Sequence, residues 1–237
     1  LDSAGASGEP WFLWVHYYDA HDPYKPPDAF RAPGDSGPLD AYRAEVRYLD
    51  HALQPLFARA SGAGTVTVVT SDHGEAFGEH GELGHGHFIY DTTTLVPIVF
   101  HAPGMLKPGS SDAAPRLIDI GPTVLDLLGL PPMTNIDGVS LRPLLEGREQ
   151  SIPPARVETR QPWIAYGWAP LEAWRQADLK LIIAPRPELY DLVADPGETV
   201  NLAETRIADA DRLELDWLAN RDAIPERSSA ALSDPAA

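Results

Sequence analysis

The chain has 237 residues, of which 43% are hydrophobic, and this is enough for one large domain with its own core. No apolar run reaches the ~20 residues that a membrane-spanning helix needs, so we expect no membrane span in this sequence. The formal net charge of -17 would repel phosphate backbones, which argues against nucleic-acid binding. The absence of cysteine excludes disulfides, thiolate metal sites and cysteine nucleophiles.

The first predicted elements come in the order strand, helix, strand. Residues 11–18 (WFLWVHYY) are an apolar run of strand length that ends in the breaker-rich segment DAHDPYKPPD. Between residues 40 and 60, apolar side chains recur at three- and four-residue spacing, which predicts an amphipathic helix. Residues 65–70 (TVTVVT) are β-branched throughout, and this favours a strand that is buried on both faces of a parallel sheet.

A further strand and helix extend this pattern. Residues 95–104 predict the strand, and residues 117–128 predict a helix that Gly129 and Pro131 would end. The alternation predicts an α/β fold with a mostly parallel sheet flanked by helices. Since ligands of such sheets bind beyond the carboxyl ends of the strands, a functional site is expected there.

The sequence pattern changes near residues 150 to 155, where we place a domain boundary. Beyond it, residues 159–168 and 178–184 are typical of antiparallel strands, and residues 207–220 of a closing helix. These segments predict a small C-terminal antiparallel α+β subdomain.

Three segments follow from this boundary. Residues 1–154 form part of the α/β domain, residues 155–226 form the subdomain, and residues 227–237 are predicted to be a disordered tail. Because the sequence begins with Leu and its opening residues lack a signal-peptide pattern, we expect the chain to start within a longer protein.

Potential ligands are densest in SDHGEAFGEHGELGHGH, which follows the predicted strand at residues 65–70. Four of the eight histidines lie between His73 and His87, and carboxylate and imidazole groups together bind divalent cations. At a strand end, Asp72 and His73 can converge on one ion. A solvated surface loop has a similar composition and remains the alternative. A triad of Ser71, Asp72 and His73 is disfavoured, because three consecutive residues do not easily align for catalysis.

A second polar group, HYYDAHDPYKPP, follows the first predicted strand and should open on the same crevice. His21 lies between Asp19 and Asp22 and close to Pro23, which fits an ordered imidazole that donates to an anionic ester oxygen. For His16, inside the strand run, a hydrogen-bonded structural role is the favoured interpretation.

Four segments resemble the C-terminal half of a sulfatase of the alkaline phosphatase superfamily, in the same order. They are FLWVHYYDAHDPYKPP, VVTSDHGEAFGEHGELGHGHFIYDTTTLVPIVFHAPG, DGVSLRPLL and ELYDLVADPGETVNLA. The second is long and specific, and together they extend from Pro10 to about Ala203, which is nearly the whole chain. The resemblance implies an alkaline-phosphatase-like α/β fold, with residues 1–154 as the C-terminal portion of the catalytic domain.

The resemblance also implies roles for four residues. In that family the Asp-His pair ligates the catalytic divalent cation, so Asp72 and His73 would bind Ca²⁺, with Mn²⁺ or Zn²⁺ as alternatives. His21 would contact the substrate sulfate. His85 stands where the family commonly has the Lys of a GKG sequence, and an imidazole there can still donate to a sulfate oxygen, although it titrates near neutrality. His21 and His85 are therefore the predicted catalytic and substrate-binding residues.

Sulfatases also carry a nucleophile that this sequence lacks. It is a formylglycine made from the Cys or Ser of a C/S-x-P-x-R motif, and an upstream Asp-Asp pair completes the metal site. This chain has no cysteine and no Ser-x-Pro-x-Arg. Both elements belong to the N-terminal half of the family, so formylglycine is expected only there, and the isolated chain is predicted to be inactive.

The resemblance predicts a sulfatase-type hydrolase that cleaves small-molecule or glycan sulfate esters with a divalent metal ion. A phosphodiesterase or phosphonate monoester hydrolase of the same superfamily is the first alternative, because phosphate and sulfate are both tetrahedral oxyanions. A catalytically inactive fragment or binding module is the second. A periplasmic or extracellular location is favoured by the family resemblance only, and the sequence predicts neither the substrate nor the oligomeric state.

Overall fold

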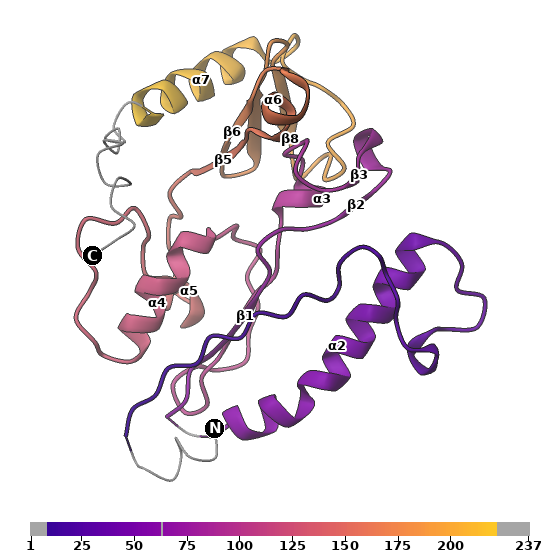
Figure 1. Cartoon of the computed structure of the whole chain (residues 1–237). Helices are drawn as coiled ribbons and strands as arrows, with labels where there is room; N and C mark the ends of the chain where they lie inside the picture. The colour runs from indigo at the N-terminus through magenta and orange to yellow at the C-terminus, as the bar shows by residue number, and fades with distance from the viewer. Residues whose placement is uncertain (1–8, 63, 222–237) are drawn as a thin grey trace, which may run out of the picture. The chain divides into compact units, whose positions relative to one another are not determined.

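The computed structural model describes residues 9–62 and 64–221 (Figure 1). The described residues divide into two compact units, one within Leu1–His85 and Val96–Ser151 and the other within Gly86–Leu95 and Ile152–Ala237. The short segment Gly86–Leu95 thus packs with the C-terminal residues. The predicted disordered tail lies outside the described residues. Across the described part of the chain, no helix is both long and apolar enough to cross a membrane.

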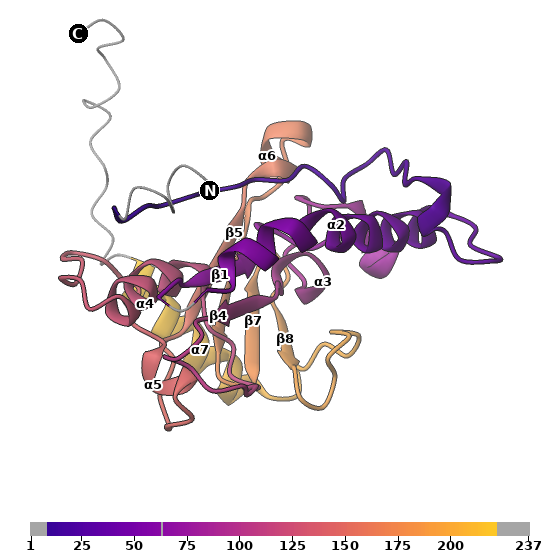
Figure 2. The same cartoon turned by 90° about the horizontal axis from the view of Figure 1, so that it is seen from below.

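The first unit contains one long helix, several short ones and two small antiparallel ladders. Its helices are α2 (Pro38–Ala60), α4 (Ile120–Leu127) and α5 (Arg142–Leu145), with 3-10 turns at Asp28–Phe30, Glu79–Gly81 and Leu117–Asp119. Its strands are β1 (Thr67–Thr70), β2 (Ala76–Phe77), β3 (Leu83–Gly84) and β4 (Ile98–His101). β1 pairs with β4 and β2 pairs with β3, and Figure 2 labels β1 and β4 beside each other. The predicted helices are confirmed, and the strands at 65–70 and 95–104 are confirmed over shorter spans.

Two strand predictions for this unit are wrong. Residues 11–18 form no strand, and their large apolar side chains are exposed, with Phe12 at 82% and Trp14 at 76%. A strand is held by a hydrogen-bonded neighbour, and no described strand pairs with this segment. β1 is not buried on both faces: within the described residues its sheet has only two strands, and Val69 and Thr70 are exposed. Its ladder with β4 is also antiparallel, not parallel. The α/β class itself is confirmed, but the ladders that the described residues form are all antiparallel, so the mostly parallel sheet is not found there.

α2 begins at a local turn that the sequence dictates. Gly37 has φ +93°, which favours glycine, and Pro38 occupies the first helical turn, where its missing N–H costs nothing. Ala41, Ala44 and Glu45 are the buried residues of the first turns. Glu45 accepts a hydrogen bond from the backbone N–H of Lys25 through Oε1, while no described group bonds its buried Oε2.

Burial, only partly offset by that hydrogen bond, raises the pKa of Glu45. A carboxyl group whose pKa is higher in the folded protein binds its proton more tightly there, so the free energy of unfolding falls as pH rises through its titration range. We therefore expect Glu45→Gln to raise Tm at pH 7 and to have less effect near pH 4. Thermal melts at both pH values test this, with the exposed Glu214→Gln as the control. An equal effect at both pH values would contradict the titration argument.

The segment DGVSLRPLL packs against the start of α4. Asp119 is fully buried, and it accepts hydrogen bonds from Arg116 Nη2 at 2.7 Å and from the backbone N–H of Val139 at 2.9 Å. An added Cβ at Gly138 would lie 2.1 Å from the carbonyl oxygen of Ile118, so only glycine permits this approach. The motif thus has a structural role in this unit.

The second unit is a four-stranded antiparallel sheet with a helix on one face. The strands, in the order β5-β6-β7-β8, are β5 (Ala155–Thr159), β6 (Leu171–Gln176), β7 (Leu179–Ile183) and β8 (Glu188–Asp191), and the helices are α3 (Asp91–Thr94), α6 (Gln161–Tyr166) and α7 (Ile207–Arg221). The predicted C-terminal antiparallel sheet and closing helix are confirmed. The strand predicted at residues 159–168 is wrong, because Pro162 in the first turn and Gly167 in the left-handed conformation frame the helix α6.

The two faces of this sheet bury different groups. One row, Trp174, Leu181 and Leu189, lies in register across β6, β7 and β8 and packs against Leu213 and Trp217 of α7. On the other face, Ile89 packs with Ala173, Ile182 and Tyr190, so the segment Gly86–Leu95 covers it. This alternation follows from the two-residue period of a strand.

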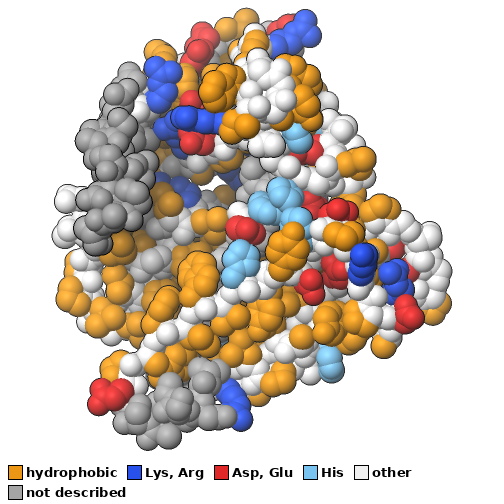
Figure 3. All heavy atoms as spheres, in the orientation of Figure 1, with side chains coloured by type: hydrophobic (Ala, Val, Ile, Leu, Met, Phe, Trp, Pro, Cys, Tyr) orange, Lys and Arg blue, Asp and Glu red, His pale blue; other side chains and the backbone are white. Residues whose placement is uncertain are grey.

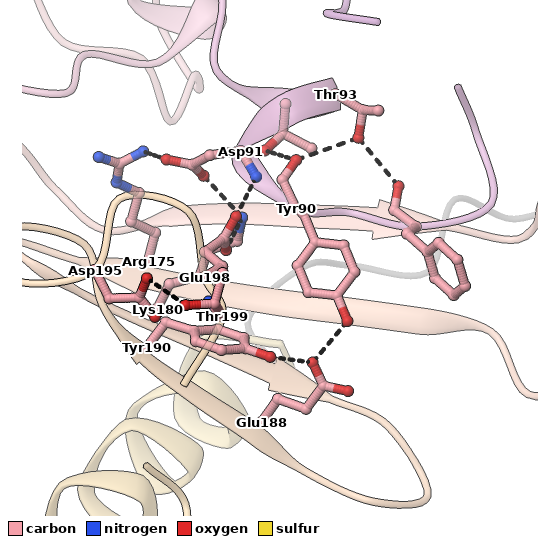
Figure 4. Close-up of polar contacts among 12 residues, drawn as sticks. Tyr90, Asp91, Thr93, Arg175, Lys180, Glu188, Tyr190, Asp195, Glu198 and Thr199 are labelled. Carbon is pink, nitrogen blue, oxygen red and sulfur yellow. Dashed lines mark hydrogen bonds and ion pairs between the residues drawn. The ribbon is translucent and has the colours of Figure 1, made fainter. Parts of the chain in front are cut away.

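A buried ionic network holds α3 to that second face (Figure 4). Lys180 Nζ lies 2.7 Å from Asp91 Oδ1 and 2.9 Å from Glu198 Oε1. Arg175 Nη1 lies 2.9 Å from Asp91 Oδ2. The side chain of Lys180 is 1% exposed and that of Glu198 is 2% exposed, so these charges are matched inside the protein.

Candidate active site

The candidate site is built on the turn after β1 and the β2–β3 hairpin, all in the first unit. Asp72 and His73 follow β1 directly. The hairpin then pairs Ala76 with Gly84, and because the strands are antiparallel, this register places Glu75 opposite His85. The chain therefore returns His85 to the strand end from which Asp72 and His73 project.

Three histidines that are far apart in the sequence meet at this place. The ring centroids of His73 and His85 are 3.7 Å apart and the rings are stacked, with 30° between their planes. The ring of His21 lies 5.7 Å from that of His85 in an edge-on arrangement. The ring of Tyr18 stacks on the ring of His21, with their centroids 4.4 Å apart. Figure 3 shows histidine side chains gathered beside acidic ones on one face of the molecule.

His21 and His73 are each oriented by a backbone carbonyl. Nδ1 of His21 lies 2.7 Å from the carbonyl oxygen of Asp22, and Nδ1 of His73 lies 2.8 Å from that of Gly74. A carbonyl can only accept, so each Nδ1 carries the hydrogen and Nε2 is the nitrogen that remains for a ligand.

The Asp72 and His73 pair fits a shared divalent cation. His73 Nε2 lies 3.8 Å from Asp72 Oδ2, and both side chains are partly exposed, at 37% and 66%. An imidazole that donates through Nδ1 to a carbonyl and offers Nε2 beside a carboxylate is a usual ligand arrangement. Within residues 9–62 and 64–221, no group of three His, Cys, Asp or Glu side chains is arranged to hold a metal ion.

The carboxylate of Asp72 is kept ionised by its surroundings. Its burial acts to raise the pKa, but the charges of His73 and His16 and the backbone N–H groups of Asp72 and His73 outweigh this and lower the pKa of Asp72. An ionised carboxylate is the form that binds a cation. The sequence analysis favoured a hydrogen-bonded structural role for His16. It therefore did not predict that this exposed histidine helps to lower the pKa of Asp72.

Glu75 and Tyr24 are site residues that the sequence did not single out. The side chain of Glu75 is 6% exposed, and Oε1 lies 3.0 Å from Nδ1 of His85. The hydroxyl of Tyr24 donates to Oε2 at 2.8 Å. Burial, together with this bond to Glu75, raises the pKa of Tyr24, so its hydroxyl remains a donor. In the sequence, Glu75 directly follows SDHG and Tyr24 directly follows HDP, and this was the only hint that they belong to the site. Their positions in the sequence do not show that the two side chains touch.

Comparison with known proteins identifies the family. The chain has the α/β fold of the alkaline phosphatase superfamily, and its residues 1–130 match the family model described as Sulfatase. This chain belongs to the sulfatase family. The resemblance that the four sequence motifs indicate is thereby confirmed.

Three similar proteins show the range of chemistry. The chain is 28% identical to a Delta 4,5-hexuronate-2-O-sulfatase of Bacteroides thetaiotaomicron, over 80% of this chain and 42% of that protein. It is 33% identical to a choline-sulfatase of Rhizobium meliloti, over 74% of this chain and 35% of that protein. The structure of a phosphonate monoester hydrolase from Silicibacter pomeroyi superposes with a TM-score of 0.65 at 28% identity, over 79% of this chain and 43% of that one. The chain thus spans less than half the length of these proteins.

Proposed function

We propose that the protein containing this chain is a sulfatase-type hydrolase that cleaves a sulfate ester with the help of a divalent metal ion. The observation that carries the proposal is the convergence of His21 and His85 beside the Asp72 and His73 pair. The substrates named for the two sulfatases above support a small-molecule or glycan sulfate ester.

In this proposal, the two outer histidines handle the substrate. Because Nδ1 of each ring faces its own acceptor, His21 and His85 donate Nε2–H to the sulfate oxygens when both ring nitrogens carry a hydrogen. One of them then gives its Nε2 proton to the leaving oxygen of the alcohol. The stacking of His85 on His73 and the edge-on contact of His21 with His85 restrict both rings, which reduces the reorganisation that binding would require.

Asp72 and His73 would hold the metal ion, for which Ca²⁺ is the first choice and Mn²⁺ or Zn²⁺ are alternatives. A bound divalent cation withdraws charge from an ester oxygen. Since calcium takes six to eight ligands, further ligands would come from other parts of the protein.

A phosphonate monoester or phosphodiester is the second candidate substrate. The similarity to a phosphonate monoester hydrolase favours it specifically. The same imidazoles can donate to phosphonate oxygens, because both anions are tetrahedral and their oxygens accept in the same way.

We propose further that the 237-residue chain alone is inactive. No cysteine and no Ser-x-Pro-x-Arg occurs in it, so no residue in its motifs matches the formylglycine nucleophile of the family. A non-catalytic binding role for the isolated chain is compatible with this.

The test compares the full-length natural protein with the 237-residue chain. An aryl sulfate, an aryl phosphonate monoester and a bis-aryl phosphate are assayed with calcium, manganese and zinc in turn. We expect the full-length protein to cleave the sulfate fastest, and the chain alone to release no product. Faster cleavage of the phosphonate would favour the second candidate, and metal-dependent turnover by the chain alone would show that it contains a nucleophile.

A further inference from the structure

Glu75 occupies a position in the site that neither the metal ligands nor the substrate contacts explain. It is a carboxylate with a side chain only 6% exposed, which is costly unless its oxygens are hydrogen-bonded. Both of its oxygens have side-chain partners: Oε1 contacts Nδ1 of His85 at 3.0 Å, and Oε2 accepts from the hydroxyl of Tyr24 at 2.8 Å.

The geometry fixes which nitrogen of His85 faces a ligand. A carboxylate accepts only, so Nδ1 of His85 must carry a hydrogen wherever this contact is made. Nε2 is then the nitrogen that faces an ester oxygen, and it donates to that oxygen when it carries the second ring hydrogen. The stacking on His73 holds the plane of the ring, and the contact with Glu75 holds its rotation within that plane.

Tyr24 fixes the carboxylate in turn. Its ring lies 5.8 Å from that of Tyr42 and 5.8 Å from that of Phe77, so it is held by aromatic packing from α2 and from the hairpin. The hydroxyl therefore reaches Glu75 from a restrained ring. This chain of contacts joins the HDPY segment to the GHG segment, although 51 residues separate Tyr24 from Glu75.

We propose that Glu75 is a positioning residue that aims Nε2 of His85 at the ester oxyanion, with Tyr24 holding the carboxylate in place. This inference rests on the proposed function for the identity of the oxyanion, but the contact itself does not depend on it. Where a lysine would need no partner to present its ammonium group, an imidazole has two different nitrogens and must be turned the right way.

The test has a spectroscopic and a kinetic part. In the 237-residue chain labelled with ¹⁵N, the ring nitrogen signals of His85 are recorded by NMR and assigned with His85→Gln. We expect a protonated Nδ1 in the wild type, and in Glu75→Leu a mixture of tautomers. In the full-length protein, Glu75→Leu should lower kcat by about 10- to 100-fold, the size of the effect when the group that orients a metal-bound histidine is removed, with a smaller change in KM.

Two further variants sharpen the test. Glu75→Gln keeps an acceptor oxygen of the same reach, so it should retain the protonated Nδ1 signal and most of kcat. Glu79→Gln is the matched control, since Glu79 lies in the same hairpin and accepts instead from the backbone N–H of Phe77 at 2.6 Å. It should change neither readout. If Glu75→Leu does not fold, Tyr24→Phe replaces it, with a smaller shift of the His85 signals in the same direction.

The outcomes separate this inference from the proposed function. His85 ring signals that stay unchanged in Glu75→Leu, or in Tyr24→Phe where that variant replaces it, would overturn the positioning role whether or not the protein cleaves a sulfate. Equal losses in Glu75→Gln and Glu75→Leu would also overturn it, because an acceptor would then not be what matters. If Glu75→Leu changes the His85 signals but the full-length wild-type protein cleaves none of the three esters, the positioning role stands and only the proposed function is refuted.

Discussion

Replacing Asp72 with alanine is expected to weaken divalent-cation binding by at least about tenfold in the full-length protein. Losing a residue that only hydrogen-bonds to a metal ligand already lowers metal affinity by about tenfold or more, and Asp72 is proposed to be a ligand itself. Asp72 offers its carboxylate 3.8 Å from Nε2 of His73. Removing it would leave one neutral nitrogen as the ligand from this turn, and calcium prefers oxygen. Calorimetric titration with Ca²⁺ and Mn²⁺ measures the effect.

The control for this variant is Asp28→Ala. Asp28 is fully exposed and lies 3.8 Å from Arg31, so its loss removes the same charge without touching the turn after β1. The affinity of that variant should stay within about twofold of the wild type, because exposed charges at a distance are largely screened. An Asp72→Ala protein that binds both ions as tightly as the wild type would remove Asp72 from the metal site.

The positions of His21, Asp72, His73 and His85 illustrate what a sequence can predict about a site. The β-branched run and the glycine-rich segment after it predicted a strand end with ligands, and the structure brings these four residues together. The contact of Glu75 with Tyr24 was not predictable, because it joins two loops through side chains that no local pattern relates. The roles of the four residues remain predictions.

The failed strand predictions have a physical cause. Residues 11–18 have the composition of a buried strand, but a strand exists only where a neighbour supplies hydrogen bonds, and composition does not state which neighbour is present. In residues 159–168, the aromatic residues favoured a strand, whereas Pro162 and Gly167 set the backbone of a helix. Local backbone restrictions outweighed the apolar pattern there.

Conversely, the register of the C-terminal sheet explains a buried charge that the sequence pattern did not predict. Lys180 alternates with Leu179 and Leu181 in β7, so it must face away from α7. On that face, Arg175 and Tyr190 lie beside it in register. The negatively charged partners of Lys180, Asp91 and Glu198, lie in segments far from β7 in the sequence, so the residues of β7 do not predict them.

Lys180→Met is expected to destabilise the second unit by about 3–5 kcal/mol, the cost of breaking a buried ion pair by removing one partner. The methionine side chain fills a similar volume, but Glu198, at 2% exposure, would lose its cation. Among the described residues, Asp91 would keep Arg175 as its one ionic partner. Urea unfolding of the 237-residue chain, followed by tryptophan fluorescence, measures the change.

Two comparisons isolate the cause of this loss. Arg212→Met removes a charge from exposed pairs with Asp209 and Asp216, at 3.7 and 3.8 Å, and should cost less than about 1 kcal/mol. The double variant Lys180→Met/Glu198→Gln should recover part of the loss, because it no longer buries an unpaired negative charge. If the double variant were as unstable as Lys180→Met, the cost would come from lost packing or hydrogen bonds, and the uncompensated charge would not be its source.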